Sequence, residues 1–176
     1  MAGQRLTDKT ALEEQLGSGD LLMVVDVNDT TGSAEGTSKK YDAKFLMQTD
    51  KFSLSNAEIK ALDSTPKTLV GALSGYYINV FSFTMFVTYA SSTESSSKDL
   101  HLTYDTSNTS VNWTIIRDCM NGKTTDITFV TNSSGSSNGA CATSILNKPF
   151  MMSASGAFNG GWTADVYVTY NYVKVL

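Results

Sequence analysis

Few residues in this chain are of a type that could carry out catalysis, and their spacing does not bring them together. Nucleophilic hydrolysis needs a base beside a serine or cysteine, and His101 is the single histidine. It stands between Leu100 and Leu102, on the opposite face of a predicted strand. This pattern is typical of a histidine that faces solvent or an interface.

The acidic residues and the cysteines form no recognisable site either. Paired carboxylates for glycoside cleavage need a defined separation, and the spacing of the aspartates predicts none. Cys119 and Cys141 lack the close Cys or His neighbours of a zinc site, and their spacing leaves open whether they are free or paired. The cluster Asp26-Val-Asn-Asp29 lacks the glycine and distal glutamate of a calcium loop. We therefore expect no enzyme activity, no metal and no cofactor.

The composition predicts a polar but weakly charged surface. Of 176 residues, 17% are charged, whereas 22 are serine, 22 threonine and 11 asparagine. The formal net charge is -4 and the pI is about 4.9, so the chain lacks the basic surface that binds nucleic acids. The length fits one domain with a short appendage.

The sequence predicts neither membrane insertion nor a secretory signal. Residues 69–90 are largely apolar, but polar residues interrupt them mostly at alternate positions, which favours a half-buried strand. The N-terminus lacks the basic and apolar regions of a secretory signal. We expect the chain to be made and kept in a cytoplasm until it is released by another route.

Charged and aromatic residues are distributed unevenly along the chain. Residues 1–70 hold 19 of the 30 charged residues but only three aromatic ones, whereas residues 71–176 hold 15 aromatic residues. A segment with so many rings and so few charges has much apolar surface to bury, which favours an oligomer. The first third of the chain is therefore predicted to be a separate functional unit.

The first unit is predicted to be a small attachment segment, residues 1–47. Residues 6–16 support a short helix that stops at Gly17. A continuous apolar run over residues 21–27 is typical of a buried strand, and residues 37–41 are placed to pair with it across a polar loop. A two-stranded hairpin is too small to be stable alone, so we expect another chain to cover it.

Residues 48–62 are interpreted as a linker and a short helix. Ser55 and Glu58 have the spacing of a capping box, which predicts a helix over residues 56–62. Pro66 prevents its continuation and favours an extended chain at Thr65. Residues 67–72 are therefore expected to form the first strand of the main domain, residues 63–176.

The main domain shows the two-residue period of antiparallel strands. One face of a strand is predicted to be the core face and the other mixed. The core face would carry Phe81, Phe83, Met85, Val87 and Tyr89, and the mixed face Val80, Ser82, Thr84, Phe86 and Thr88. The polar tract 90–99 is interpreted as a solvent-facing hairpin loop, like residues 132–139. Further strands are predicted over residues 100–104, 111–116, 125–130, 149–154 and 163–176. The fold class is therefore all-β, an antiparallel sandwich of the jelly-roll kind.

Aromatic residues near the C-terminus have two interpretations. Large rings at strand positions fill the interior of a sandwich, and exposed rings stack on sugars or pack against another chain. The candidates for ligand or oligomer contacts are Trp162, Tyr167, Tyr170 and Tyr172.

Two segments resemble virion proteins of bacteriophages. Residues 19–40, GDLLMVVDVNDTTGSAEGTSKK, preceded by Leu6-Thr-Asp and Leu12, resemble the N-terminal docking segment of many tailed-bacteriophage fibre proteins. Residues 54–70, LSNAEIKALDSTPKTLV, followed by an aromatic-rich strand, are similar to the start of a β-domain of phage virion proteins. Together these segments cover about 40 residues. Asp42 and Lys44 depart from the pattern, which usually continues with an apolar strand after Ser-Lys-Lys.

The resemblance implies a virion structural protein, a short head or tail fibre. It would be assembled in the bacterial cytoplasm and would dock on capsid or tail proteins by its N-terminus while displaying a trimeric β-sandwich. The alternative is a receptor-binding module for a host glycan or protein. The residues expected to attach the chain to the virion are Leu21, Leu22, Val24, Val25, Asp26, Val27, Lys39 and Lys40.

Overall fold

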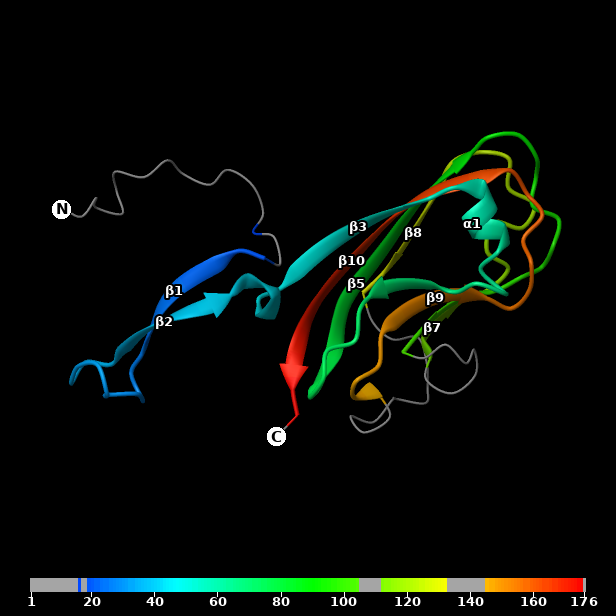
Figure 1. The fold of residues 1–176 in the computed structure, drawn as a ribbon. Helices are drawn as coiled ribbons and strands as arrows, with labels where there is room; N and C mark the ends of the chain where they lie inside the picture. Colours follow the sequence, from blue (N-terminus) through cyan, green and yellow to red (C-terminus); the bar gives the residue numbers. More distant parts are fainter. Residues whose placement is uncertain (1–15, 17–18, 105–111, 133–144, 176) are drawn as a thin grey trace, which may run out of the picture. The chain divides into compact units, whose positions relative to one another are not determined.

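The computed structural model describes residue 16 and residues 19–104, 112–132 and 145–175 (Figure 1). The chain divides into two compact units, Met1–Lys44 and Phe45–Leu176. The expected helix over residues 6–16, apart from Leu16, lies outside the described residues, as do Cys141 and nearly all of the loop 132–139. Within the described residues, no helix is long and apolar enough to cross a membrane.

The first unit contains the predicted hairpin. Strand β1 (Leu21–Asp26) pairs antiparallel with β2 (Thr37–Asp42), and Leu21 lies opposite Asp42. Gly36, which precedes β2, has a φ of 122°, and a side chain at this position would meet the carbonyl oxygen of Asp26. The turn therefore requires glycine there.

In the residues that the structure describes, the second unit has eight strands and a short helix. After a 3-10 turn, η2 (Ala43–Phe45), the elements are β3 (Gln48–Leu54), α1 (Asn56–Lys60), β4 (Lys67–Val70), β5 (Tyr76–Tyr89), β6 (Leu100–Thr103), β7 (Asn112–Ile116), β8 (Ile127–Thr131), β9 (Phe150–Ala154) and β10 (Trp162–Lys174).

The strand order is that of a jelly roll, which confirms the predicted fold class. One four-stranded sheet has the order β3-β10-β5-β8 and the other β4-β9-β6-β7. All neighbouring strands are antiparallel. The pairs β3:β10, β4:β9, β5:β8 and β6:β7 form one long antiparallel ribbon, and rolling it up adds the contacts β10:β5 and β9:β6. Figure 1 shows β3, β10 and β5 side by side, with α1 at one end.

The interpretation of residues 48–62 as a linker is wrong for its first half. β3 pairs with β10 over seven residues, from Gln48 opposite Tyr170 to Leu54 opposite Ala164, and so is an edge strand of the sandwich. The helix prediction is confirmed, although α1 ends at Lys60. Glu58 accepts a 2.9 Å hydrogen bond from the Ser55 N–H, and the Glu58 N–H donates to the Ser55 hydroxyl, which completes the capping box.

A β-bulge in β5 corrects the predicted facing of this strand. Ser82 lies opposite Thr169, and Val80 lies opposite Tyr170, so Phe81 is an extra residue without a partner in β10. One extra residue reverses the alternation beyond it. Val80 is consequently buried and Phe81 is 42% exposed, contrary to the prediction that Phe81 faces the core.

The hydrophobic core lies between the two sheets. Its largest completely buried side chains come from both sheets and from the segment after α1. They are Trp162, Phe83, Phe150, Leu62, Ile78, Leu100, Leu102, Met152, Val87, Val166 and Val168. His101 is half-buried between the buried Leu100 and Leu102, in agreement with a position on the opposite face of β6.

Three loops meet around the buried side chain of Glu94, which corrects the prediction that residues 90–99 form a solvent-facing hairpin loop. β5 and β6 belong to different sheets, so this segment crosses between the two layers. The Glu94 carboxylate accepts hydrogen bonds from the N–H groups of Asn159 (2.9 Å), Gly160 (2.8 Å) and Ser96 (2.9 Å), and from the Ser96 hydroxyl. The backbone carbonyl oxygen of Glu94 accepts a further hydrogen bond from the N–H of Gly122 at 2.8 Å.

Candidate docking hairpin

β1 carries apolar side chains on both of its faces. In an antiparallel pair, residues opposite each other share a face. Leu21, Met23 and Val25 therefore lie on one face, and Leu22 and Val24 on the other. An antiparallel strand with one solvated face alternates apolar and polar residues, whereas a strand covered on both faces is continuously apolar. β1 has the sequence of a strand that is covered on both sides.

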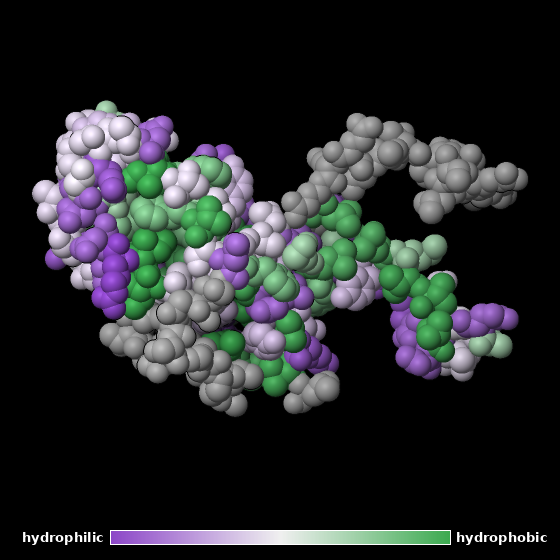
Figure 2. Space-filling view, turned by 180° about the vertical axis from the view of Figure 1, so that it is seen from behind, coloured by the Kyte–Doolittle hydropathy of each residue, from purple (hydrophilic) through white to green (hydrophobic). Residues whose placement is uncertain are grey.

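In the isolated chain these side chains are largely exposed. Met23 is 84% exposed, and Leu21, Val25 and Val27 are each more than half exposed. Figure 2 shows apolar residues, in green, at the surface of the hairpin. Burial of a Leu, Val or Met side chain contributes roughly 1.5–3 kcal/mol. The exposed strand is thus a substantial source of binding free energy for a partner.

The opposite strand and the loop are polar and hydrogen-bonded within themselves. The Lys39 ammonium group lies 2.9 Å from an Asp26 carboxylate oxygen and 2.7 Å from one of Asp29. The Thr31 hydroxyl and N–H donate to Asp29, and the Gly32 N–H donates to the Thr37 hydroxyl at 2.9 Å. Exposed ion pairs stabilise proteins only slightly, so the main effect of these contacts is to fix the shape of the loop.

The charges of this network shift one another's pKa values. Hydrogen bonds from Lys39 and Thr31 hold the pKa of Asp29 far below its ordinary value, and the hydrogen bond from Lys39 also lowers the pKa of Asp26. The two carboxylates in turn raise the pKa of Lys39. The three groups stay ionised at neutral pH, so Lys39 is neutralised by its own hairpin.

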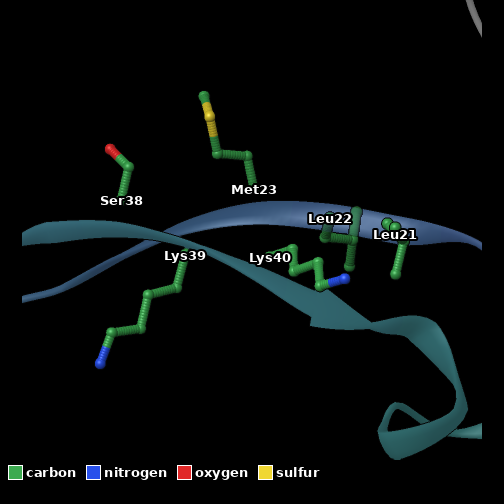
Figure 3. Close-up of a pocket in the computed structure, with 6 residues that line it drawn as sticks. All are labelled: Leu21, Leu22, Met23, Ser38, Lys39 and Lys40. Atoms are coloured by element: carbon green, nitrogen blue, oxygen red, sulfur yellow. The ribbon is translucent and has the colours of Figure 1, made fainter.

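An open hollow of about 350 Å³ runs along the strands. It is lined by Leu21, Leu22, Met23, Ser38, Lys39 and Lys40. Met23 and Ser38 point to one side of the hairpin and Lys39 to the other (Figure 3). Because the lining side chains come from both faces, the hollow is a contact surface rather than a closed ligand cavity.

The structure brings the predicted attachment residues together on this hairpin. Leu21, Leu22, Val24, Val25 and Asp26 belong to β1, Lys39 and Lys40 belong to β2, and Val27 follows β1. Sequence reasoning missed two members of the surface. Met23 was passed over within the apolar run although it is the most exposed of its side chains, and Asp29, spaced three residues from Asp26, shares the bond to Lys39.

The aromatic candidates in β10 divide into buried and exposed rings. Trp162 is completely buried and Tyr170 nearly so, which corrects their assignment as contact residues. Burial raises the pKa of Tyr170, whose hydroxyl donates to Asp50 at 2.9 Å. Tyr172 is half-buried, and its hydroxyl donates to the Gly71 carbonyl oxygen at 2.8 Å. Trp162, Tyr170 and Tyr172 occupy alternate positions of β10, on the face that packs against the second sheet.

Tyr167 differs because it lies on the outer face of the sheet. Its ring packs edge-to-face against Phe86, with the centroids 5.8 Å apart, and Phe86 is 49% exposed. The Lys51 ammonium group lies 5.7 Å from the Tyr167 ring centroid and pairs with Asp165 at 2.8 Å. This outer face combines an exposed ring, Phe86, and a half-buried ring, Tyr167, with a charged pair, and sequence reasoning had not singled out Phe86.

Comparisons with known proteins identify no family. The chain matches no protein-family model, and no curated protein matches its sequence. Among solved structures it is similar to a chain of the cyanophage Pam1 capsid asymmetric unit, with a TM-score of 0.39 and 9% sequence identity over 98% of this chain and 99% of that chain. A likeness of this degree does not establish a shared fold or function, so the function must be argued from the chain's own residues.

Proposed function

We propose that this chain is a structural protein of a bacteriophage virion, a short head or tail fibre without catalytic activity. The hairpin docks on a capsid or tail protein, and the jelly roll is displayed outward. The proposal places the chain in the virion after assembly in the bacterial cytoplasm.

One observation carries the proposal, the contrast between the two units. The jelly roll has a continuous core of its own between two sheets, with Phe83 and Trp162 completely buried. The hairpin instead exposes the apolar side chains of β1, and a two-stranded sheet without a partner is marginally stable. A self-sufficient domain joined to an apolar strand is the arrangement expected of a displayed head and its anchor, and it agrees with the resemblance of residues 19–40 to fibre docking segments.

We further propose that the chain is a trimer, as the resemblance implies. Native mass spectrometry of the purified chain measures the copy number directly. A trimer is expected, and a strict monomer at micromolar concentration would contradict this part of the proposal without affecting the docking role.

The docking role is tested by placing charge on the exposed strand. Virions of the phage that encodes the chain are prepared without it and mixed with purified protein, and binding is measured by co-sedimentation. The double variant Met23→Asp, Val25→Asp should lose binding, because two carboxylates cannot be buried without partners. Val130→Asp is the matched control, since Val130 is 62% exposed in the jelly roll. Equal binding of the double variant and the wild type would contradict docking by the hairpin.

The second candidate function is recognition of a host receptor by the jelly roll. Phe86, which is 49% exposed and packs edge-to-face against the half-buried Tyr167, favours it, because aromatic side chains are enriched in binding surfaces. Adsorption of virions to host cells should fall when Tyr167 is replaced by Ala, whereas incorporation into virions should stay unchanged. Normal adsorption of this variant and of Phe86→Ala would remove the candidate.

A further inference from the structure

The direction of the backbone groups in β1 follows from one hydrogen bond. The N–H of Ala43 donates to the carbonyl oxygen of Asp20 at 2.9 Å. These residues lie opposite each other in the register that pairs Leu21 with Asp42. A residue in a strand directs its N–H and C=O to the same side, and successive residues alternate. Asp20 therefore points its backbone groups toward β2.

The alternation leaves three residues of β1 with backbone groups that point away from β2. Among the strands that the structure describes, β1 pairs with β2 alone. Within the described part of the chain, the outer edge of β1 thus presents a row of N–H and C=O groups without backbone partners. This row belongs to Leu21, Met23 and Val25.

The two edges of the hairpin differ in their chemistry. The same alternation assigns the outer edge of β2 to Ser38, Lys40 and Asp42. Charged residues, and lysine above all, protect an edge strand from pairing with other chains. The edge of β1 has no charge between Asp20 and Asp26. The hairpin is protected on the β2 side and open on the β1 side.

We propose that the hairpin docks by strand addition, with the outer edge of β1 pairing with an exposed edge strand of a virion protein of a different kind. The partner's sheet continues through β1 and ends at β2, and the partner covers the apolar side chains on both faces of β1. Main-chain hydrogen bonds then supply affinity and the alternate side chains supply specificity. This inference rests on the proposed function and specifies the docking partner.

Charge argues against a second copy of this chain as the occupant. Antiparallel pairing of two β1 strands centred on Met23 would place Asp20 of one copy beside Asp26 of the other at both ends. Like charges directly opposite each other destabilise a sheet. The fitting partner is an apolar strand of about five residues that is flanked by Lys or Arg.

Proline substitution separates the two edges experimentally. Proline removes an N–H and is tolerated in edge strands where that N–H points outward. Met23→Pro removes an N–H from the outer edge of β1, and Val25→Pro does the same independently. Lys40→Pro is the matched control on the outer edge of β2, and Met23→Leu keeps both the N–H and an apolar side chain.

The full-length variants are tested for co-sedimentation with virions that lack this chain. Met23→Pro and Val25→Pro should each bind at least about tenfold more weakly than the wild type, whereas Lys40→Pro and Met23→Leu should bind within about twofold of it. Thermal unfolding of the jelly roll should be the same in all four variants. If Met23→Pro and Val25→Pro both bind virions as strongly as the wild type, or if only Lys40→Pro loses binding, strand addition through β1 is overturned. The docking proposal itself would still stand. No binding of the wild-type chain would overturn both proposals.

Discussion

Glu94 and Gly160 lie 66 residues apart in the sequence and are joined by a buried 2.8 Å hydrogen bond from the Gly160 N–H to the Glu94 carboxylate. The same carboxylate oxygen accepts from the N–H of Asn159. The other oxygen accepts from Ser96, so the carboxylate satisfies donors of two loops. A buried acceptor of this kind stabilises a fold because every donor around it would otherwise be left unpaired.

Replacing Glu94 by Gln should therefore destabilise the jelly roll. The amide NH2 group of Gln would face N–H donors in place of one carboxylate oxygen, and a charged acceptor would become neutral. Unsatisfied buried donors cost about 1–3 kcal/mol each, so we expect a loss of about 2 kcal/mol or more in the free energy of unfolding, measured by urea denaturation at pH 7. An unchanged urea midpoint would show that the loops close without this carboxylate.

The same residue should make stability depend on pH. Burial by itself raises the pKa of Glu94, but hydrogen bonds from Ser96, Gly160 and Asn159 outweigh it and hold the pKa below the ordinary value of 4.5. A pKa lowered by folding means that the contribution of the carboxylate is complete above about pH 4.5 and is lost as the pH falls through the lowered value. Urea midpoints measured between pH 7 and pH 3 should drop less in Glu94→Gln than in the wild type.

Glu58 provides the control for this pH dependence. Lys67 and Ser55 lower its pKa to about 2, yet its side chain is exposed and its ion pair with Lys67 is solvated. Solvent screening makes such pairs weak. The urea midpoint of Glu58→Gln should therefore fall between pH 7 and pH 3 by about as much as that of the wild type. If it fell as little as that of Glu94→Gln, the special role of the buried carboxylate would be contradicted.

Local patterns in the sequence predicted most elements of this fold. The capping box of Ser55 and Glu58 places the start of α1, and the two-residue period places most strands. The jelly-roll class was predicted, but the strand order was not, because it depends on pairs such as β3 with β10, which are more than 100 residues apart. β3 itself was interpreted as a linker because its polar and charged residues alternate only weakly with apolar ones.

The candidate site was predicted for a similar local reason. A continuous apolar run of residues 21–27 needs no distant contact to be recognised, and the structure shows most of its apolar side chains exposed. Glu94 could not be predicted to be buried, because its burial depends on Asn159 and Gly160, which come from the far end of the chain. Trp162 likewise becomes a core residue only once the two sheets face each other.

The bulge at Phe81 predicts a sharp contrast between two neighbouring phenylalanines. Phe83 is completely buried between the sheets, whereas Phe81 has no partner in β10 and is 42% exposed. Phe83→Ala should lower the free energy of unfolding by about 3–5 kcal/mol, the usual cost of emptying a core site. Phe81→Ala should cost well under about 1 kcal/mol in the same urea titration. Equal costs would mean that both rings face the core and that the strand alternates without a bulge.

Gly161 should tolerate no side chain. A Cβ atom at this position would lie 2.8 Å from the Ser92 backbone nitrogen and would also clash with the Ser91 hydroxyl. The backbone of Gly161 is held there by its own N–H, which donates to the Ser92 carbonyl oxygen at 2.8 Å. Gly161→Ala must therefore push two loops apart, and we expect a loss of about 1–3 kcal/mol in the free energy of unfolding.

Gly71 supplies the matched control for this substitution. A Cβ atom at Gly71 has no neighbour within 4 Å. Gly71→Ala should therefore behave like a neutral surface substitution and leave the melting temperature within about one or two degrees of the wild type. Gly161→Ala should lower it clearly by differential scanning calorimetry. If both variants have the same melting temperature, the loops around Gly161 leave more room for a Cβ atom than the 2.8 Å distance to the Ser92 nitrogen indicates. The closure of this end of the jelly roll would then not depend on glycine.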